Sequence, residues 1–389
     1  MKTKINEKKS VEVSARIPFF RHDLGQPEVE AFEDALKDPI ITTGAITETF
    51  ERRFADYLGA NHALAVTSCT GAMHMALLGL GVGPGDEVIT TPMTFIATAT
   101  AILEAGAKPV FVDVEADTGN IDVGLIEAAI TPNTKAILPV HLYGLMVDMK
   151  AIRALADQYG LLVIEDAAHC IEGHRDGLRP GQLSEAACFS FYATKNMTCG
   201  EGGALVVNDT KLYERLKLIR LHGMDKTAFD RSKDGYSHWD MVMMGWKYNL
   251  SNLDASMLLP QLDRLDGNLE KRSKRAQLYR KLLEPVEQIE MQGSRLNAVN
   301  ARHVFNVWIK GAPRDDVIAQ LENRHIESVV NYRAIHLHQY FSKTFGFRKG
   351  ALPIAEQLGD STLSLPFYPN MPLDHIHTVS NALKEILFS

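Results

Sequence analysis

Between residues 50 and 210, short apolar runs alternate with stretches of helical spacing. Runs such as LLVI at 161–164 are apolar at consecutive positions, which predicts strands covered on both faces. Strands are predicted at 62–68, 86–92, 108–114, 135–144, 161–169, 186–194 and 203–209. Helices are predicted at 51–58, before the first strand, and between the strands at 70–81, 94–106, 122–130 and 149–160. This alternation predicts an α/β fold with a mostly parallel sheet.

The C-terminal part of the chain has a different pattern. Residues 253–283 have the spacing of one long helix, in which Pro260 is a place for a bend. The segments after it predict a compact α+β unit. Because 389 residues are too many for one ordinary core, two domains are expected. We predict a large domain over 1–255, which includes a polar N-terminal arm, and a smaller domain over 256–389.

Composition and charge exclude several classes of protein. The formal net charge of −7 gives no sign of the basic surface that a nucleic-acid partner requires. No apolar run approaches the roughly 20 residues of a membrane span, and residues 1–16 lack the apolar core of a secretory signal. Four cysteines without a CxxC pair predict neither disulfides nor a metal site, and they favour the cytoplasm.

Two charged residues follow predicted strands, where ligands of parallel sheets bind. Asp166, in EDAAH at 165–169, ends a buried strand, and a carboxylate there calls for a cation such as a protonated pyridine nitrogen. Lys195, in SFYATKN at 190–196, follows another strand, where burial favours the neutral amine of a Schiff base. The alternatives are that Asp166 caps a turn and that Lys195 belongs to an ordinary loop.

Small polar residues at other strand ends suggest an anion site. TSCTGAMH at 67–74 opens a helix, so the N–H groups near Thr70 and Gly71 are available to a phosphate. Ser190 is placed to reach the same group. Ordinary helix capping explains the hydroxyl residues equally well. Phe95 follows a further strand and is placed either to stack on a cofactor or to join the core. The chain has no Walker loop, and without a GxGxxG fingerprint it does not fit a Rossmann dehydrogenase.

Taken in chain order, these segments resemble the DegT/StrS family of sugar aminotransferases. The resemblance runs from ITTGAITETFERRFADYLGA at 41–60 to LSLPFYP at 363–369, and it includes PVHLYG, VIEDAAH, SFYATKN and GWKYNLSNLDA. It implies fold type I of the pyridoxal-phosphate (PLP) transferases. It also implies that Lys195 forms the Schiff base with PLP, that Asp166 pairs with the pyridine nitrogen, and that His169 and Phe95 flank the ring.

The resemblance assigns the remaining cofactor contacts as well. Thr70, Gly71 and Ser190 match phosphate ligands. Asn249, in GWKYNLSNLDA, matches an asparagine that reaches the phosphate of the neighbouring subunit, which implies a homodimer with its sites at the interface. A turn residue or a helix N-cap is the alternative interpretation of Asn249.

The resemblance finally implies the reaction. Lysine at position 195 favours transamination over the dehydration of relatives that carry histidine there, and DAAH rather than DCAQ favours glutamate as donor and a nucleotide-linked keto-sugar as acceptor. GWKYNLSNLDA is most similar to enzymes that aminate C4 of UDP-linked 4-keto sugars. Three alternatives remain: a 3-keto-sugar aminotransferase, a PLP dehydratase of the same fold, and a non-catalytic nucleotide-sugar sensor. The predicted substrate contacts are the following cationic or titratable residues: Arg231, Lys247, Arg333 and His336, with Arg220 as a further possibility.

Overall fold

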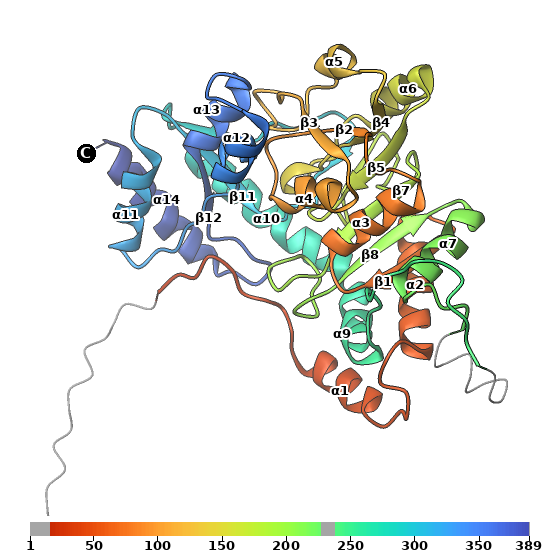
Figure 1. The fold of residues 1–389 in the computed structure, drawn as a ribbon. Helices are drawn as coiled ribbons and strands as arrows, with labels where there is room; N and C mark the ends of the chain where they lie inside the picture. The colour runs from red at the N-terminus through yellow and green to blue at the C-terminus, as the bar shows by residue number, and fades with distance from the viewer. Residues whose placement is uncertain (1–15, 227–237, 389) are drawn as a thin grey trace, which may run out of the picture.

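A central sheet of seven strands organises the computed structural model, which describes residues 16–226 and 238–388 (Figure 1). In spatial order the strands are β1 (His62–Val66), β8 (Gly203–Val207), β7 (Ala186–Ser190), β5 (Leu162–Asp166), β4 (Thr134–Leu138), β2 (Glu87–Thr90) and β3 (Lys108–Phe111). All neighbouring pairs are parallel except the two that involve β8. The predicted mostly parallel α/β sheet is therefore confirmed.

Helices cover both faces of the sheet, because successive side chains of a strand point to opposite sides. Ala187 and Phe189 of β7 enter one apolar core, to which α2, α6 and α9 contribute. Ala186 and Cys188 enter a second core, to which α3, α4 and α7 contribute. These helices are α2 (Ala45–Leu58), α3 (Cys69–Gly79), α4 (Ala97–Glu104), α6 (Met149–Tyr159), α7 (Thr210–Arg220) and α9 (Asn252–Asp263).

A second unit has its own core, built on an antiparallel sheet in the order β12, β11, β9. The elements of this core are β9 (Ile289–Met291), β11 (Phe305–Ile309), α11 (Arg314–Glu322), β12 (Thr362–Leu365) and α14 (Leu373–Phe388). Two further helices pack elsewhere: α12 (Gln339–Phe345) packs with Phe111 of β3, and α13 (Pro353–Ser361) packs with Trp308 of β11 and Tyr143. The long helix α10 (Leu265–Leu283) joins this core from Ala276 onward. Ile17, in the N-terminal segment, also packs there rather than on the large sheet. The predicted domain boundary at residue 255 stays a prediction.

The remaining helices, strands and 3-10 turns are short. They are α1 (Gln26–Ala35), which lies beside α9 in Figure 1, α5 (Val123–Ile126), β6 (His174–Arg175), β10 (Ala298–Val299) and the 3-10 turns Glu127–Ala129, Leu142–Gly144 and Ile335–Leu337.

Most predicted elements have somewhat different bounds in the structure, and three of the differences change the description of the fold. The strand predicted at 135–144 ends at Leu138, since Pro139 has no N–H to donate and Tyr143 adopts a φ of 58°. The strand predicted at 186–194 ends at Ser190. The helix predicted at 253–283 is two helices, α9 and α10, separated at Arg264, whose backbone is not helical, while Pro260 lies inside α9. The chain beyond each shortened strand forms a loop of the site.

Candidate functional site

Asp166 is the last residue of β5, and only 5% of it is exposed. The Thr98 hydroxyl donates to one carboxylate oxygen at 2.7 Å, and the Ala168 N–H donates to the other at 3.1 Å. The hydrogen bond from Ala168 also makes Asp166 the cap of a turn, which is the role that the alternative interpretation gave it. Among residues 16–226 and 238–388, however, no cation pairs with this carboxylate. Since buried carboxylates normally require a cation, the site fits a ligand with a protonated nitrogen.

Lys195 lies in a turn after β7, in which its N–H donates to the Tyr192 carbonyl at 2.9 Å. Its side chain is half-buried. Burial lowers the pKa of the Lys195 amine to about 8, although the charges of Asp166 and Cys69 act in the opposite direction. A neutral amine is therefore accessible near neutral pH, as Schiff-base chemistry requires.

Ser190 and the start of α3 are brought together through Gly203. Ser190 pairs with Gly203 across β7 and β8, and a Cβ on Gly203 would lie only 2.6 Å from the Cys69 nitrogen. The absence of a side chain thus lets the N-terminus of α3 approach the strand pair. The Thr70 hydroxyl has no side-chain partner among the described residues, whereas the Gly71 N–H donates to the N-cap Ser68 at 3.0 Å. Hydroxyl groups at the N-terminus of a helix are among the groups that bind phosphates.

His169 is buried three residues beyond Asp166. The Tyr143 N–H donates to its Nδ1 at 3.2 Å, and its Nε2 is 3.1 Å from the Tyr332 hydroxyl. Burial, together with the charges of Lys195 and His303, holds the pKa of His169 well below its ordinary value. The imidazole is therefore neutral at pH 7. Phe95 is exposed rather than in the core, and its ring centroid lies 6.1 Å from that of Tyr332.

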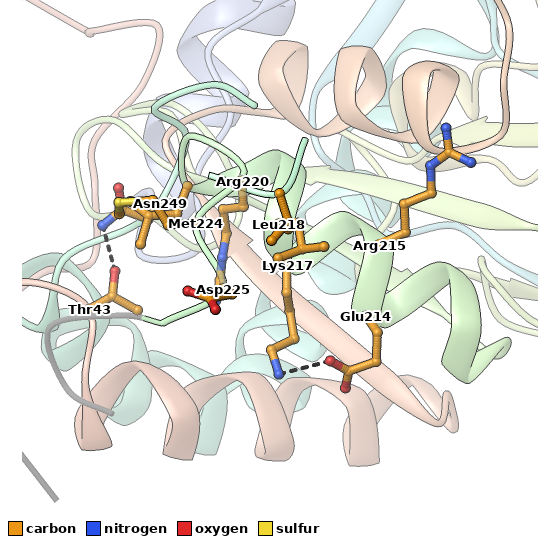
Figure 2. Close-up of a pocket in the computed structure, with 11 residues that line it drawn as sticks. Thr43, Glu214, Arg215, Lys217, Leu218, Arg220, Met224, Asp225 and Asn249 are labelled. Atoms are coloured by element: carbon orange, nitrogen blue, oxygen red, sulfur yellow. Dashed lines mark hydrogen bonds and ion pairs between the residues drawn. The ribbon is translucent and has the colours of Figure 1, made fainter. Parts of the chain in front are cut away.

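The backbone of Asn249 bridges Val66 at the end of β1, and Asn249 lines a pocket of about 450 Å³ that Lys195 does not line (Figure 2). Its Nδ2 donates to the Thr43 hydroxyl at 2.7 Å, and the Lys247 ammonium donates to its Oδ1. The N-cap of α9 is Ser251, so the capping alternative for Asn249 is wrong. The pocket is lined by Thr43, Glu214, Arg215, Lys217, Leu218, Arg220, Leu221, Met224, Asp225, Val242 and Asn249.

The predicted substrate contacts divide into exposed and buried residues. Lys247 and Arg333 are exposed. His336 is fully buried and its Nε2 lies 3.0 Å from Glu356, while the buried Arg220 forms an ion pair with Glu51. These two pairs satisfy groups that would be costly alone in the interior. His336 has no exposed surface, whereas Arg220 still lines the pocket beside Asn249. Arg231 lies outside the described residues.

Several residues near the site were not predicted from the sequence. Thr98 holds Asp166, and Tyr143 and Tyr332 hold His169. The His303 ring lies 4.3 Å from the His169 ring, and His303 and Lys195 line a common cavity of about 20 Å³. Tyr143 lies in PVHLYG, one of the motifs on which the family resemblance rests. This motif was the only signal in the sequence that could have pointed to Tyr143. Nothing in the local pattern marked His303 or Tyr332.

Comparisons with known proteins agree along the chain. The model of the DegT/DnrJ/EryC1/StrS aminotransferase family matches residues 22–384. The spore coat polysaccharide biosynthesis protein SpsC of Bacillus subtilis is 37% identical over 377 residues, which are 95% of this chain and 97% of SpsC.

Solved structures share the whole fold. DesV of S. venezuelae superposes with a TM-score of 0.89 at 35% identity, covering 96% of this chain and 99% of DesV. Spr1654 of Streptococcus pneumoniae, in its PMP form, superposes with a TM-score of 0.90 at 28% identity, covering 96% and 99%. Among the described residues, no helix is long and apolar enough to cross a membrane.

The family match over residues 22–384 and the shared fold of the solved structures lead to one conclusion. The chain belongs to the DegT/DnrJ/EryC1/StrS aminotransferase family and is a PLP-dependent aminotransferase of the sugar-modifying type.

Proposed function

We propose that this protein transfers an amino group from glutamate to C4 of a nucleotide-linked 4-keto-6-deoxy sugar, for the synthesis of a surface polysaccharide or glycan in the cytoplasm. The observation that carries the proposal is the buried Asp166 carboxylate without a cation, in the same site as the amine of Lys195, whose pKa is lowered. The naming of SpsC for spore coat polysaccharide supports the biosynthetic role. The four free, buried cysteines suit a reducing compartment.

PLP fits the residues of this site, and Spr1654 has also been solved in a PLP form. We propose that Asp166 faces the ring nitrogen, that His169 and Phe95 flank the ring, and that Thr70, Gly71 and Ser190 hold the phosphate. When bound, PLP supplies an electron sink for the carbon that exchanges the amino group. A carboxylate at the ring nitrogen keeps that nitrogen protonated, and a neutral His169 adds no competing charge.

The amine of Lys195 is the group that moves protons in this proposal. In its neutral form it removes a proton from the α-carbon of glutamate, and it later returns a proton to the sugar carbon that receives the nitrogen. The exposed Lys247 and Arg333 are the predicted partners of the substrate's pyrophosphate. They act through local charge, because the chain as a whole is negative.

A single-turnover screen tests the acceptor. The enzyme is first loaded with the amino group from glutamate, and UDP-, dTDP-, GDP- and CDP-linked keto-sugars are then added one at a time. We expect one 4-keto-sugar nucleotide to consume the amine, with the new C–N bond at C4 by NMR of the product. An amine at C3, a deoxygenated product, or binding without consumption would replace the proposal with the 3-keto-sugar, dehydratase or sensor alternative.

The lowered pKa of Lys195 leads to a pH-dependent prediction. We expect the rate at which PLP bonds to Lys195 in the cofactor-free protein to rise with pH about a midpoint near 8, because the neutral amine is the nucleophile. Borohydride reduction and peptide mass spectrometry at each pH measure this rate. A midpoint for Lys195 near about 10.4, the ordinary value of a solvated lysine, would contradict the desolvation argument.

We also propose a homodimer in which Asn249 serves the partner's site. Exposed apolar side chains occur on loops that follow strands of the large sheet and on the segment before Asn249, which supports an interface. They are Phe95, Ile96, Tyr192, Met241, Val242 and Met244. Asn249 lines the pocket of about 450 Å³, whereas Lys195 lines a different cavity of about 20 Å³, which supports an in-trans role.

Complementation tests the in-trans role. Lys195→Ala and Asn249→Ala subunits, each inactive alone, are mixed under conditions where subunits exchange. We expect recovery toward about a quarter of wild-type activity, because half the dimers are mixed and each has one intact site of two. Tagged subunits confirm the exchange. Absence of recovery despite exchange, or a monomer by light scattering, would show that Asn249 does not act in the partner's site.

A further inference from the structure

The hydrogen bonds around His169 fix the position of its proton. The backbone N–H of Tyr143 can only donate, so Nδ1 of His169, at 3.2 Å, must accept and carries no proton. In the neutral imidazole the proton is then on Nε2. Nε2 is 3.1 Å from the Tyr332 hydroxyl, and it therefore donates to the Tyr332 oxygen. This leaves the phenolic proton of Tyr332 free to be donated elsewhere.

The phenolic proton has no other acceptor in the part of the chain that the structure describes. Burial, with the nearby charges of Tyr143 and Asp166, raises the pKa of Tyr332 well above its ordinary value, so the hydroxyl stays protonated. The ring of Tyr332 is nearly parallel to that of His169, at 15° and 6.0 Å, and it lies 6.1 Å from the ring of Phe95. The hydroxyl is thus a hydrogen-bond donor among the residues that surround the proposed cofactor.

The backbone around Tyr332 is held from several sides. The Tyr143 hydroxyl donates to the Asn331 carbonyl, and the Thr362 hydroxyl lies 3.1 Å from the same oxygen. The Ile335 N–H donates to the Pro92 carbonyl at 2.9 Å, which ties this segment to the loop that carries Phe95. Gly359 permits a close approach, since a Cβ there would lie 2.7 Å from the Ala334 nitrogen. A donor held in this way needs little reorganisation when a ligand binds.

We propose that Tyr332 is a further catalytic residue, whose hydroxyl donates a hydrogen bond to an oxygen of the bound reactants while His169 fixes its orientation. The acceptor is either the ring oxygen of the cofactor or the carbonyl oxygen of the keto-sugar. Tyr332 keeps its proton throughout and stabilises negative charge on that oxygen. This inference rests on the proposed function for the identity of the reactants, but the orientation of Tyr332 by His169 does not.

The first test uses the cofactor-free protein and needs no substrate. In ¹⁵N-histidine NMR spectra we expect His169 to be protonated on Nε2 and not on Nδ1 at pH 7. Tyr332→Phe removes the acceptor, so the Nε2–H signal of His169 should shift while the tautomer is retained. Tyr340→Phe, on an exposed residue of α12, is the matched control and should leave the signal in place. A proton on Nδ1, or no shift in Tyr332→Phe, would overturn the proposal.

The second test identifies the acceptor in the loaded enzyme. If Tyr332 bonds the cofactor, Tyr332→Phe should move the visible absorption band and its pH midpoint. If Tyr332 instead donates its hydrogen bond to the sugar carbonyl, the position of the absorption band should not change. Amino transfer to the keto-sugar should then slow by about 10²-fold, while the rate of the glutamate half-reaction stays the same. An unmoved band together with both half-reactions within about twofold of wild type would overturn the proposal. Failure of every keto-sugar to react with the wild type would instead reject the proposed function.

Discussion

Lys195→Ala should abolish turnover almost completely and leave part of the cofactor affinity. The variant loses both the covalent attachment and the group that moves the proton, and proton transfer alone accounts for roughly 10²- to 10⁴-fold in rate. The proposed contacts of Thr70, Gly71 and Ser190 with the phosphate remain. We therefore expect weak PLP binding without the absorption band of the lysine-bound cofactor, measured by equilibrium dialysis and absorbance spectroscopy.

Two further variants make this result specific. Lys195→Arg keeps the positive charge but offers no amine, so it should be as inactive as the alanine variant. Lys310→Ala removes an exposed lysine whose partner is Glu290 on the surface, and it should retain wild-type activity. Thermal unfolding of all three checks that they fold. Turnover of Lys195→Ala within about tenfold of wild type would refute the central assignment.

Asp166→Asn should slow proton transfer strongly while weakening PLP binding only modestly. Asparagine keeps the shape of the side chain and its bond with Thr98, but it removes the charge that would keep the ring nitrogen protonated. Loss of one preorganised electrostatic group costs roughly 10²- to 10³-fold in rate. Cofactor affinity should fall by about tenfold or less, since a charge-assisted hydrogen bond is worth about twice a neutral one.

Single-turnover stopped-flow spectroscopy with glutamate measures the proton-transfer step directly. With glutamate deuterated at its α-carbon, the kinetic isotope effect should be larger in Asp166→Asn than in wild type, because proton transfer limits the rate more strongly in the variant. Asp157→Asn is a control on the exposed face of α6 and should match wild type. An unchanged single-turnover rate in Asp166→Asn would make Asp166 a structural turn cap alone.

The sequence by itself determined the sheet and the residues at its strand ends. Consecutive apolar residues before Asp166 and Lys195 specify buried strands locally, and parallel strands bring their carboxyl ends to one edge. These two positions could therefore be predicted without a structure. The motifs also indicated the family, which the match over residues 22–384 confirmed.

The tertiary structure decided which polar side chains are available. His336 is a predicted substrate contact, but it is fully buried beside Glu356. Arg220, a further predicted contact, is paired with Glu51 and still lines the pocket beside Asn249. Conversely, Tyr332 meets His169 from 163 residues away. Burial and distant pairing are not encoded in local periodicity, because a side chain's exposure and hydrogen bonds depend on which segments fold against it. The strand ends thus follow from the local sequence, whereas the hydrogen bonds that orient Tyr332 required the folded chain.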